Sequence, residues 1–239
     1  MRERAAAAGR DLPVGHRPGL IAVDGSAASG KSTIGRLLAR RLGFRFLDTG
    51  IMYRAVTRAA LDRSVDVHDA AALTDVASSI EIHVLVPEPG AADDARVIID
   101  GCDVTSLLRS PEVDENVSFV SCVAGVRESL VRRQREIAGQ GRIVMAGRDI
   151  GTVVLPNAEL KVYLDASPEE RARRRHADFV RSGRQATETD VLQDLRRRDQ
   201  IDSERDVSPQ KPADDAVYIN TDGMTSGEVL ERVVELASR

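Results

Sequence analysis

The sequence contains no tryptophan, and aromatic residues make up only 3% of its 239 positions. Proteins that bind single-stranded nucleic acid without sequence preference stack bases on aromatic side chains, so this scarcity argues against that class. The formal net charge is -4, which indicates no attraction of the whole molecule to nucleic acid or to an anionic membrane. Apolar residues make up 42% and charged residues 30%, ordinary values for a globular protein.

Cysteine and histidine are too few and too scattered to suggest a metal centre or a disulfide framework. The two cysteines, Cys102 and Cys122, form no C-x-x-C and have no histidine at ligand spacing. We expect both to be small buried apolar residues. The four histidines form no H-E-x-x-H motif, and we expect them on the surface or in packing contacts.

Long hydrophobic runs are missing as well. No segment approaches the roughly 18 apolar residues that a membrane-spanning helix needs. Residues 1–18 mix both charge signs with glycine and proline and hold no apolar stretch, so they do not resemble a secretory signal. We expect a disordered N-terminal tail on a cytoplasmic protein. A monomer is the default expectation, because no self-complementary apolar stripe is evident.

What the sequence does have is five short apolar runs with helical patterns between them. The runs are residues 20–23, 44–47, 143–146, 160–164 and 216–220. Strands that alternate with helices predict an α/β fold, with a five-stranded parallel sheet and helices on both faces. The helical patterns have clear boundaries, such as the stop at Gly43 and the caps at Ser167 and Thr225.

The alternation is broken between residues 65 and 125. A short helical pattern at 69–79 is followed by apolar stretches at 80–86, 96–100 and 102–104, which predict a small antiparallel sheet. We therefore expect an inserted α+β subdomain over residues 65–125. The core is then made of residues 19–64 and 126–239.

The most specific motif is G-x-x-x-x-G-K-S, which lies between an apolar run and an amphipathic helical pattern. Backbone N–H groups in such a loop converge on an anion, and the helix N-terminus adds positive partial charge. Lys31 can reach the outer phosphates of ATP, and Ser32 can ligate Mg²⁺. The residues expected to bind ATP are Gly25, Ser26, Ala27, Ala28, Ser29, Gly30, Lys31, Ser32 and Thr33.

The alternative for this motif is a tight glycine turn with an exposed lysine. Only three of the 34 basic residues are lysines, so a motif that demands lysine is rarely filled by accident. The sequence lacks the guanine-reading N-K-x-D of GTPases and a D-x-x-G after the second apolar run. The third run leads into AGRDIG rather than into the acidic pair of motor and helicase cores.

A second phosphate-binding element is predicted at residues 47–56, LDTGIMYRAV. The turn after the second strand lies at the carboxyl edge of the sheet, where open α/β folds bind ligands. The Thr49 hydroxyl and the Arg54 guanidinium can bind the phosphate of an acceptor. The alternative is a capping threonine and a surface arginine.

Arginines gather at turns rather than on open helix faces. Arg148 and Asp149 follow the third strand, ERARRR (170–175) follows the fourth, and RRRDQIDSER (196–205) ends a helix. Phosphoryl transfer needs this distribution, because the charge on the moving group is neutralised from several directions. Solvated faces or RNA binding are the alternative for any one cluster.

Several separated blocks together resemble the bacterial cytidylate kinases. These blocks are IAVDGSAASGKST, FLDTGIMYRAV, VRESLVRRQREIA, AGRDIGTVVLPNAELKVYLDASPEERARRR and RRRDQIDSERDVSP, and the resemblance covers Leu20 to the C-terminus. It implies an ATP-dependent kinase for CMP and dCMP with a P-loop core, a mobile lid over about residues 167–190, and a CMP-binding insert.

The resemblance also implies roles for particular residues. Those implied to contact CMP are Thr49, Arg54, Ser118, Arg127, Arg148, Asp149, Arg198, Asp202 and Arg205. Those implied to be catalytic are Lys31, Arg148 and the lid arginines Arg171, Arg174 and Arg175. Which of Asp149 and Asp202 reads the cytosine amino group stays open. No catalytic histidine or cysteine is expected, because a phosphate dianion is already a nucleophile.

One departure from the family concerns the residue before G-R-D, which is often acidic there and is Ala146 in this chain. We expect Ser32 and Asp149 to organise Mg²⁺ in its place. Two other functions remain as alternatives. One is a nucleotide-sensing regulatory or RNA-associated protein, and the other is a kinase for another small acceptor.

Overall fold

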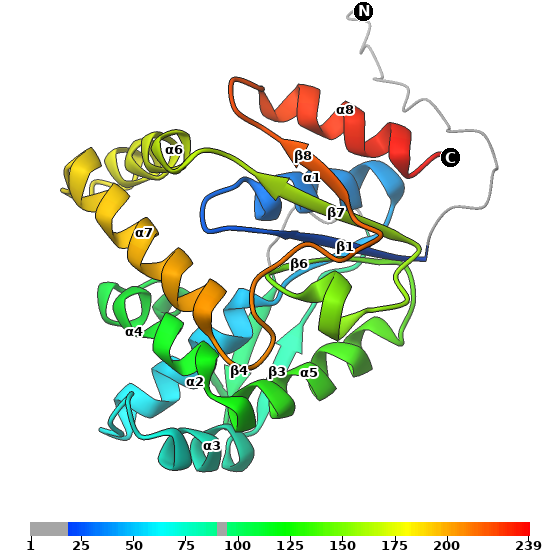
Figure 1. Cartoon of the computed structure of the whole chain (residues 1–239). Coiled ribbons are helices and arrows are strands. Elements are labelled where there is room, and N and C mark those ends of the chain that lie inside the picture. Colours follow the sequence, from blue (N-terminus) through cyan, green and yellow to red (C-terminus); the bar gives the residue numbers. More distant parts are fainter. Residues whose placement is uncertain (1–18, 90–94) are drawn as a thin grey trace, which may run out of the picture.

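A parallel sheet of five strands forms the centre of the molecule (Figure 1). The computed structural model describes residues 19–89 and 95–239, so the predicted tail over residues 1–18 lies outside the described residues. The strand order is β2-β6-β1-β7-β8, and all four pairings are parallel. The strands are β1 (Leu20–Gly25), β2 (Arg45–Asp48), β6 (Ile143–Gly147), β7 (Leu160–Asp165) and β8 (Val217–Asn220). These are the five predicted runs, and the predicted α/β class is confirmed.

Helices cover both faces of the sheet because its strands are apolar on both sides. Along β1, Ala22 faces one buried cluster while Ile21 and Val23 face another. Helices α1 (Lys31–Leu42) and α8 (Ser226–Leu236) contribute to the second cluster. Helices α2 (Gly50–Asp62) and α5 (Ala124–Ala138) contribute to the first.

The predicted helix boundaries are confirmed by their caps. Gly43 ends α1 in the left-handed conformation, with φ of 68°. The hydroxyl of Ser167 accepts from the N–H of Glu170 at the start of α6 (Pro168–Arg181). Thr225 and Glu228 form a reciprocal capping box at the start of α8.

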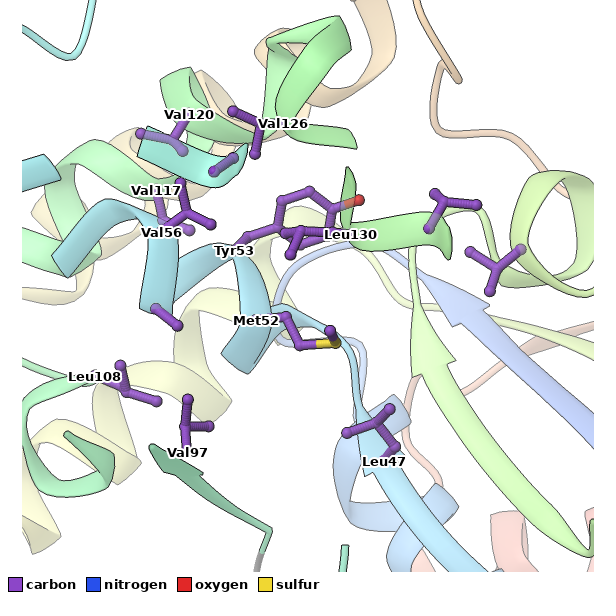
Figure 2. Packing of buried hydrophobic residues seen from close by; sticks show 14 of the residues in the cluster. Leu47, Met52, Tyr53, Val56, Val97, Leu108, Val117, Val120, Val126 and Leu130 are labelled. Carbon is purple, nitrogen blue, oxygen red and sulfur yellow. The ribbon is translucent and has the colours of Figure 1, made fainter. Parts of the chain in front are cut away.

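The segment between α2 and α5 forms the predicted antiparallel sheet, β3-β4-β5. Its elements are α3 (Ala70–Ser79), β3 (Ile82–Leu85), β4 (Arg96–Ile99), β5 (Cys102–Asp103), η1 (Thr105–Leu107) and α4 (Pro111–Cys122). Val97 and Val117 belong to the same buried cluster as Leu47 and Met52 of the core (Figure 2). The insert is therefore fastened to one face of the core by shared apolar packing.

The expectation for the cysteines was wrong for Cys102, which is exposed, while Cys122 is half-buried. Cys102 lies on β5, a two-residue strand directly after the Gly101 turn, where the short sheet leaves side chains open to solvent. Within the described parts of the chain, no helix is long and apolar enough to cross a membrane.

Two helices in contact with each other, α6 and α7 (Glu188–Glu204), project beyond the carboxyl edge of the sheet (Figure 1). A small apolar cluster joins Ala172 of α6, Val191 and Leu195 of α7, and Ala27 of the loop after β1. The other face of α7 contacts α4 of the insert. The helical pair therefore bridges the first loop of the core and the insert.

Candidate active site

The loop between β1 and α1 has the backbone of an anion-binding turn. Ala28 and Gly30 have φ of 60° and 93°, and Gly30 precedes α1 without a side-chain cap. The first N–H groups of α1 are therefore available to an anion. A Cβ on Gly25, whose φ is 153°, would lie 2.1 Å from the carbonyl oxygen of Leu164, so the close approach of loop and β7 demands glycine here.

Lys31, the first residue of α1, is buried against this loop. Its Nζ donates to the carbonyl oxygen of Ser26 at 2.8 Å. Burial, together with the nearby charge of Arg148, lowers the pKa of Lys31 from 10.5 to about 7. The negative charge of a polyphosphate would favour the protonated form of this amine.

The hydroxyl of Ser32 lies beside a carboxylate that the sequence analysis did not single out. Ser32 Oγ donates to Asp48 Oδ2 at 2.6 Å, and Asp48 Oδ1 accepts from the N–H of Gly50 at 3.0 Å. Asp48 ends β2 and pairs in register with Ala146 on β6. Its place at the carboxyl edge of the sheet was the signal that could have identified it.

These oxygens fit Mg²⁺, which prefers hard oxygen ligands and is usually held by one or two protein groups plus phosphate oxygens. Within the described residues, no group of three or more histidine, cysteine or acidic side chains forms a dedicated metal cage. The carboxylate of Asp149, which we had expected to share the ion with Ser32, is instead bonded to Arg127.

Two pockets meet at the phosphate loop. The first is lined by all nine residues implied to contact CMP, and the second by Ser29, Gly30, Thr33 and Arg174, among others. The residues that line both pockets are Ala28, Lys31, Ser32, Asp48, Arg109 and Arg175. A group passed from one pocket to the other would therefore remain beside Lys31 and Ser32.

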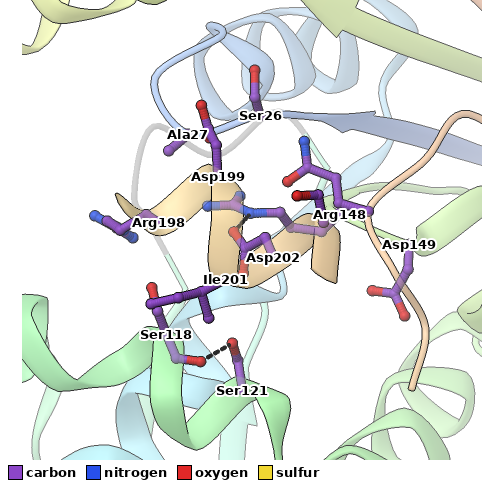
Figure 3. Close-up of polar contacts among 12 residues, drawn as sticks. Ser26, Ala27, Ser118, Ser121, Arg148, Asp149, Arg198, Asp199, Ile201 and Asp202 are labelled. Atoms are coloured by element: carbon purple, nitrogen blue, oxygen red, sulfur yellow. Dashed lines mark hydrogen bonds and ion pairs between the residues drawn. The ribbon is translucent and has the colours of Figure 1, made fainter. Parts of the chain in front are cut away.

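The first pocket contains a network of buried ion pairs. Arg127 is paired with Asp149. Arg148 is paired with Asp202 of α7 (Figure 3). Arg205 lies between them, with its Nη2 3.9 Å from Asp149 Oδ1 and its Nη1 4.0 Å from Asp202 Oδ1. Arginines outnumber aspartates in this network, so it keeps positive charge for an anionic ligand.

The pKa of Asp202 reflects this pairing. Burial acts to raise it, but the Arg148 guanidinium holds the pKa of Asp202 below its usual value. In the same network, burial lowers the pKa of Arg198 to about 10, and the charge of Arg148 acts in the same direction. Asp202 is therefore a hydrogen-bond acceptor in neutral solution.

Thr49 and Arg54 both line the first pocket, at the start of α2. The Thr49 hydroxyl donates to the carbonyl oxygen of Ala146 at 3.0 Å. Arg54 Nη1 donates to Asp114 Oδ1 at 2.7 Å and to the carbonyl oxygen of Leu108 at 3.0 Å. The structure thus brings both side chains to the pocket and hydrogen-bonds each of them to another segment of the same protein.

The three arginines implied for the lid have different surroundings. Arg175 lines both pockets, and Arg174 lines the second, where its Nη2 donates to the carbonyl oxygen of Thr221 at 2.7 Å. Arg171 lines neither pocket. It is buried, donates to the carbonyl oxygen of Ala27 at 3.2 Å, and pairs with Asp199 at 2.7 Å.

Sequence reasoning also missed Arg109 and Ser121. Arg109 follows η1 in the insert and lines both pockets, and Ser121 lines the first and donates to the carbonyl oxygen of Ser118 at 2.9 Å (Figure 3). Neither stands in a motif that pointed to phosphate chemistry. Only the packing of the insert against α2 and α7 brings them to the pocket.

Asp24 of β1, the strand that precedes the phosphate loop, holds the segment after β6 by hydrogen bonds. Its carboxylate accepts from the N–H groups of Ile150 and Gly151, both at 2.7 Å. Burial raises the pKa of Asp24 from 3.8 to about 6, although these two hydrogen bonds act to lower it.

This pKa predicts a pH-dependent contribution to stability. The pKa of Asp24 is higher in the folded protein than in the unfolded chain. The protonated carboxyl therefore makes its full contribution to stability below pH 3.8, and that contribution is lost as the pH rises through about 6. A pKa change of this size corresponds to about 3 kcal/mol. Urea unfolding of the nucleotide-free parent and of Asp24→Asn between pH 3.5 and 8 measures it. We expect the difference between the two free energies of unfolding to change by about 3 kcal/mol in favour of the variant as the pH rises, and a constant difference would contradict the assignment.

The fold and the site together define a P-loop phosphotransferase with a second, arginine-lined pocket for an anionic acceptor. The cytidylate kinase family model matches residues 21–239. A cytidylate kinase of Bacillus licheniformis is 45% identical over 219 residues, which cover 92% of this chain and 96% of that protein. One of Exiguobacterium sibiricum is 48% identical over 217 residues, which cover 91% and 96%. This chain belongs to the cytidylate kinase family and is a nucleoside monophosphate kinase.

Solved structures give weaker likenesses. A shikimate kinase from Bacteroides thetaiotaomicron matches with a TM-score of 0.47 at 14% identity, over 93% of this chain and 99% of that one. A TM-score this low carries no argument, so the strand order alone describes the fold.

Proposed function

We propose that this chain transfers the γ-phosphoryl group of ATP to CMP and dCMP, forming ADP and CDP or dCDP. The observation that carries the proposal is the pair of pockets with one common wall at the phosphate loop. The family assignment names the reaction class, and the shared wall gives the two phosphate chains a place to meet in line.

The donor occupies the second pocket. The loop from Gly25 to Thr33 wraps the phosphates, with Lys31 at the outer ones. Ser32, supported by Asp48, would hold Mg²⁺. The ion would supply positive charge that neutralises the donor phosphates. Arg174 and Arg175 add fixed positive charge from α6.

The acceptor occupies the first pocket. Its phosphate is mostly a dianion at neutral pH and needs no general base. The proposed CMP contacts are Thr49, Arg54, Ser118, Arg127, Arg148, Asp149, Arg198, Asp202 and Arg205. We assign the orientation of its phosphate to Arg54 and Arg148, whose side chains reach the pocket from two different elements, α2 and the turn after β6.

Two carboxylates of the pocket, Asp149 and Asp202, explain how cytosine could be preferred over uracil. An ionised carboxylate accepts hydrogen bonds and donates none, so it suits the cytosine amino group and opposes the uracil oxygen in the same position. Asp149 is paired with Arg127, and the ion pair of Asp202 with Arg148 favours the ionised form of Asp202.

We assign residues 65–125 to a CMP-binding subdomain and about residues 167–190, around α6, to a lid that closes over both nucleotides and excludes water. Arg171 fits an anchoring role within that lid, since it ties α6 to the carbonyl oxygen of Ala27. We also propose a cytoplasmic monomer that binds no nucleic acid.

A panel of acceptors tests the proposed reaction. ADP release from MgATP is measured with CMP, dCMP, UMP, AMP and GMP, with and without EDTA. We expect at least a tenfold preference in kcat/KM for CMP over UMP, because the wrong base leaves buried polar groups unpaired, and we expect activity to vanish with the metal. Equal rates with another acceptor would instead identify a kinase for that acceptor. No dependence on any acceptor, combined with salt-sensitive RNA binding, would favour the regulatory alternative.

A further inference from the structure

One carboxylate, Asp114 in the first turn of α4, joins three parts of the molecule. Its Oδ1 accepts from Arg54 Nη1 at 2.7 Å, and its Oδ2 accepts from Arg184 Nη1 at 2.9 Å and lies 3.5 Å from Arg175 Nη2. Arg54 belongs to α2 of the core, Arg175 to α6, and Arg184 to the turn after α6. Figure 1 shows α4 beside α7.

The contact is shielded from water on its core side and partly exposed on its lid side. The exposed fraction of the side chain is 12% for Asp114 and 16% for Arg54, against 25% for Arg175 and 35% for Arg184. Arg175 and Arg184 lie over the ring of Phe179, with guanidinium carbons 4.7 Å and 4.2 Å from its centre. Partial burial keeps such charge-assisted hydrogen bonds stronger and less screened than ordinary surface pairs.

The charges of this cluster favour the binding of another anion beside the Asp114 carboxylate. Three guanidinium groups surround one carboxylate, so the cluster keeps a net positive charge. Burial acts to raise the pKa of Asp114, but Arg54 and Arg184 hold it below its usual value, so the carboxylate is ionised in neutral solution. Arg54 and Arg175 both line the first pocket, where the acceptor phosphate is proposed to bind.

We infer that Asp114 is a positioning residue that holds Arg54 at the acceptor site and ties that arginine to the lid through Arg175 and Arg184. The inference rests on the proposed function. Arg54 has a long side chain that would otherwise lose conformational freedom when a phosphate binds. With its Nη1 fixed by Asp114 and the Leu108 carbonyl, much of that ordering precedes binding. The same carboxylate makes lid closure and acceptor binding favour each other.

The kinetic test is Asp114→Asn, which keeps the shape of the side chain and removes its charge. We expect KM for CMP to rise about five- to tenfold, as for the loss of one charge-assisted hydrogen bond, with kcat changed less than about twofold. Arg58→Gln is the matched control, because Arg58 lies one turn further along α2 and pairs only with the exposed Asp62 among the described ion pairs. This control is expected to keep the parental KM and kcat.

A distance measurement tests the link to the lid without relying on activity. Spin labels are placed on the exposed native Cys102 of the insert and on Val180→Cys at the exposed end of α6, in a Cys122→Ser background. Without nucleotides, we expect Asp114→Asn to broaden the distance distribution toward longer values relative to the otherwise identical parent. Arg184→Gln, which breaks only the lid side of the contact, should broaden it as well and leave KM for CMP closer to the parent.

An unchanged distance distribution in both variants would overturn the inference whatever the kinetics. A broadened distribution with an unchanged KM for CMP would overturn the acceptor-site half of it. If the acceptor panel showed no CMP phosphorylation at all, the proposed function would fail, and the distance measurement would still decide whether Asp114 holds the lid.

Discussion

Lys31→Ala is expected to lower kcat for CMP phosphorylation at least about a hundredfold, the loss typical of removing one oriented electrostatic group. Lys31 lines both pockets, so its charge acts on the group in transit as well as on the bound donor. A group that acts mainly in the transition state changes kcat more than KM. Steady-state kinetics with saturating MgATP measure both.

Stability separates this loss from a folding defect. Burial lowers the pKa of Lys31 to about 7, which means that its charge is unfavourable in the nucleotide-free fold. We therefore expect Lys31→Ala to unfold at the parental temperature or above it without nucleotide. Lys211 is one of the other two lysines and lies on the surface, so Lys211→Ala should leave kcat unchanged.

Arg148→Ala is the companion variant in the first pocket, and we expect a loss of similar size in kcat. The physical reason differs, because removing Arg148 also leaves the carboxylate of Asp202 without its partner. Near-normal CMP phosphorylation by both Lys31→Ala and Arg148→Ala would refute the assignment of the two pockets to phosphoryl transfer.

Arg127→Ala is expected to reduce the free energy of unfolding by about 3–5 kcal/mol, the cost of leaving a buried charge without its partner. The Arg127 and Asp149 side chains are only 3% and 5% exposed. Arg205, with its Nη2 3.9 Å from Asp149 Oδ1, can replace only part of the lost interaction. Urea unfolding without nucleotides measures the effect.

A second variant shows whether the uncompensated carboxylate is the cause. Arg127→Ala combined with Asp149→Ala should recover part of the loss, because the unpaired charge is gone. Arg58→Ala breaks a partly exposed pair and should cost less than about 1 kcal/mol. If Arg127→Ala cost no more than Arg58→Ala, the buried pair would have no special part in stability.

Much of the fold could be predicted because the signals are local. The five apolar runs became the five strands, since a parallel sheet covered on both faces needs strands that are apolar on both sides. The caps at Ser167 and Thr225 were readable because a capping side chain and its N–H partner lie three residues apart. Cys102 could not be placed, because its exposure depends on how the insert's short sheet is covered.

The residues of the candidate site also fall into those that a local motif predicts and those that only packing brings together. The phosphate loop is a continuous motif, so its residues could be named in advance. Asp48 was overlooked, although it lies next to the predicted Thr49, because its contact with Ser32 joins the ends of two different elements. Arg171 stands in the same arginine-rich run as Arg174 and Arg175 and yet lines neither pocket. Its guanidinium is instead bonded to the carbonyl oxygen of Ala27 and to Asp199, partners that no local pattern indicates.

By itself, the sequence determined the order of strands and helices along the chain, the phosphate-loop motif, and the family to which the chain belongs. Hydrophobic period, capping and backbone freedom act over a few residues, so they can be read along the chain. Only the tertiary structure decided that Asp149 pairs with Arg127, that Ser32 meets Asp48, and that Asp114 gathers three arginines from separate elements. Charges far apart in sequence meet only where packing brings them together, and no local pattern records which partner each will find.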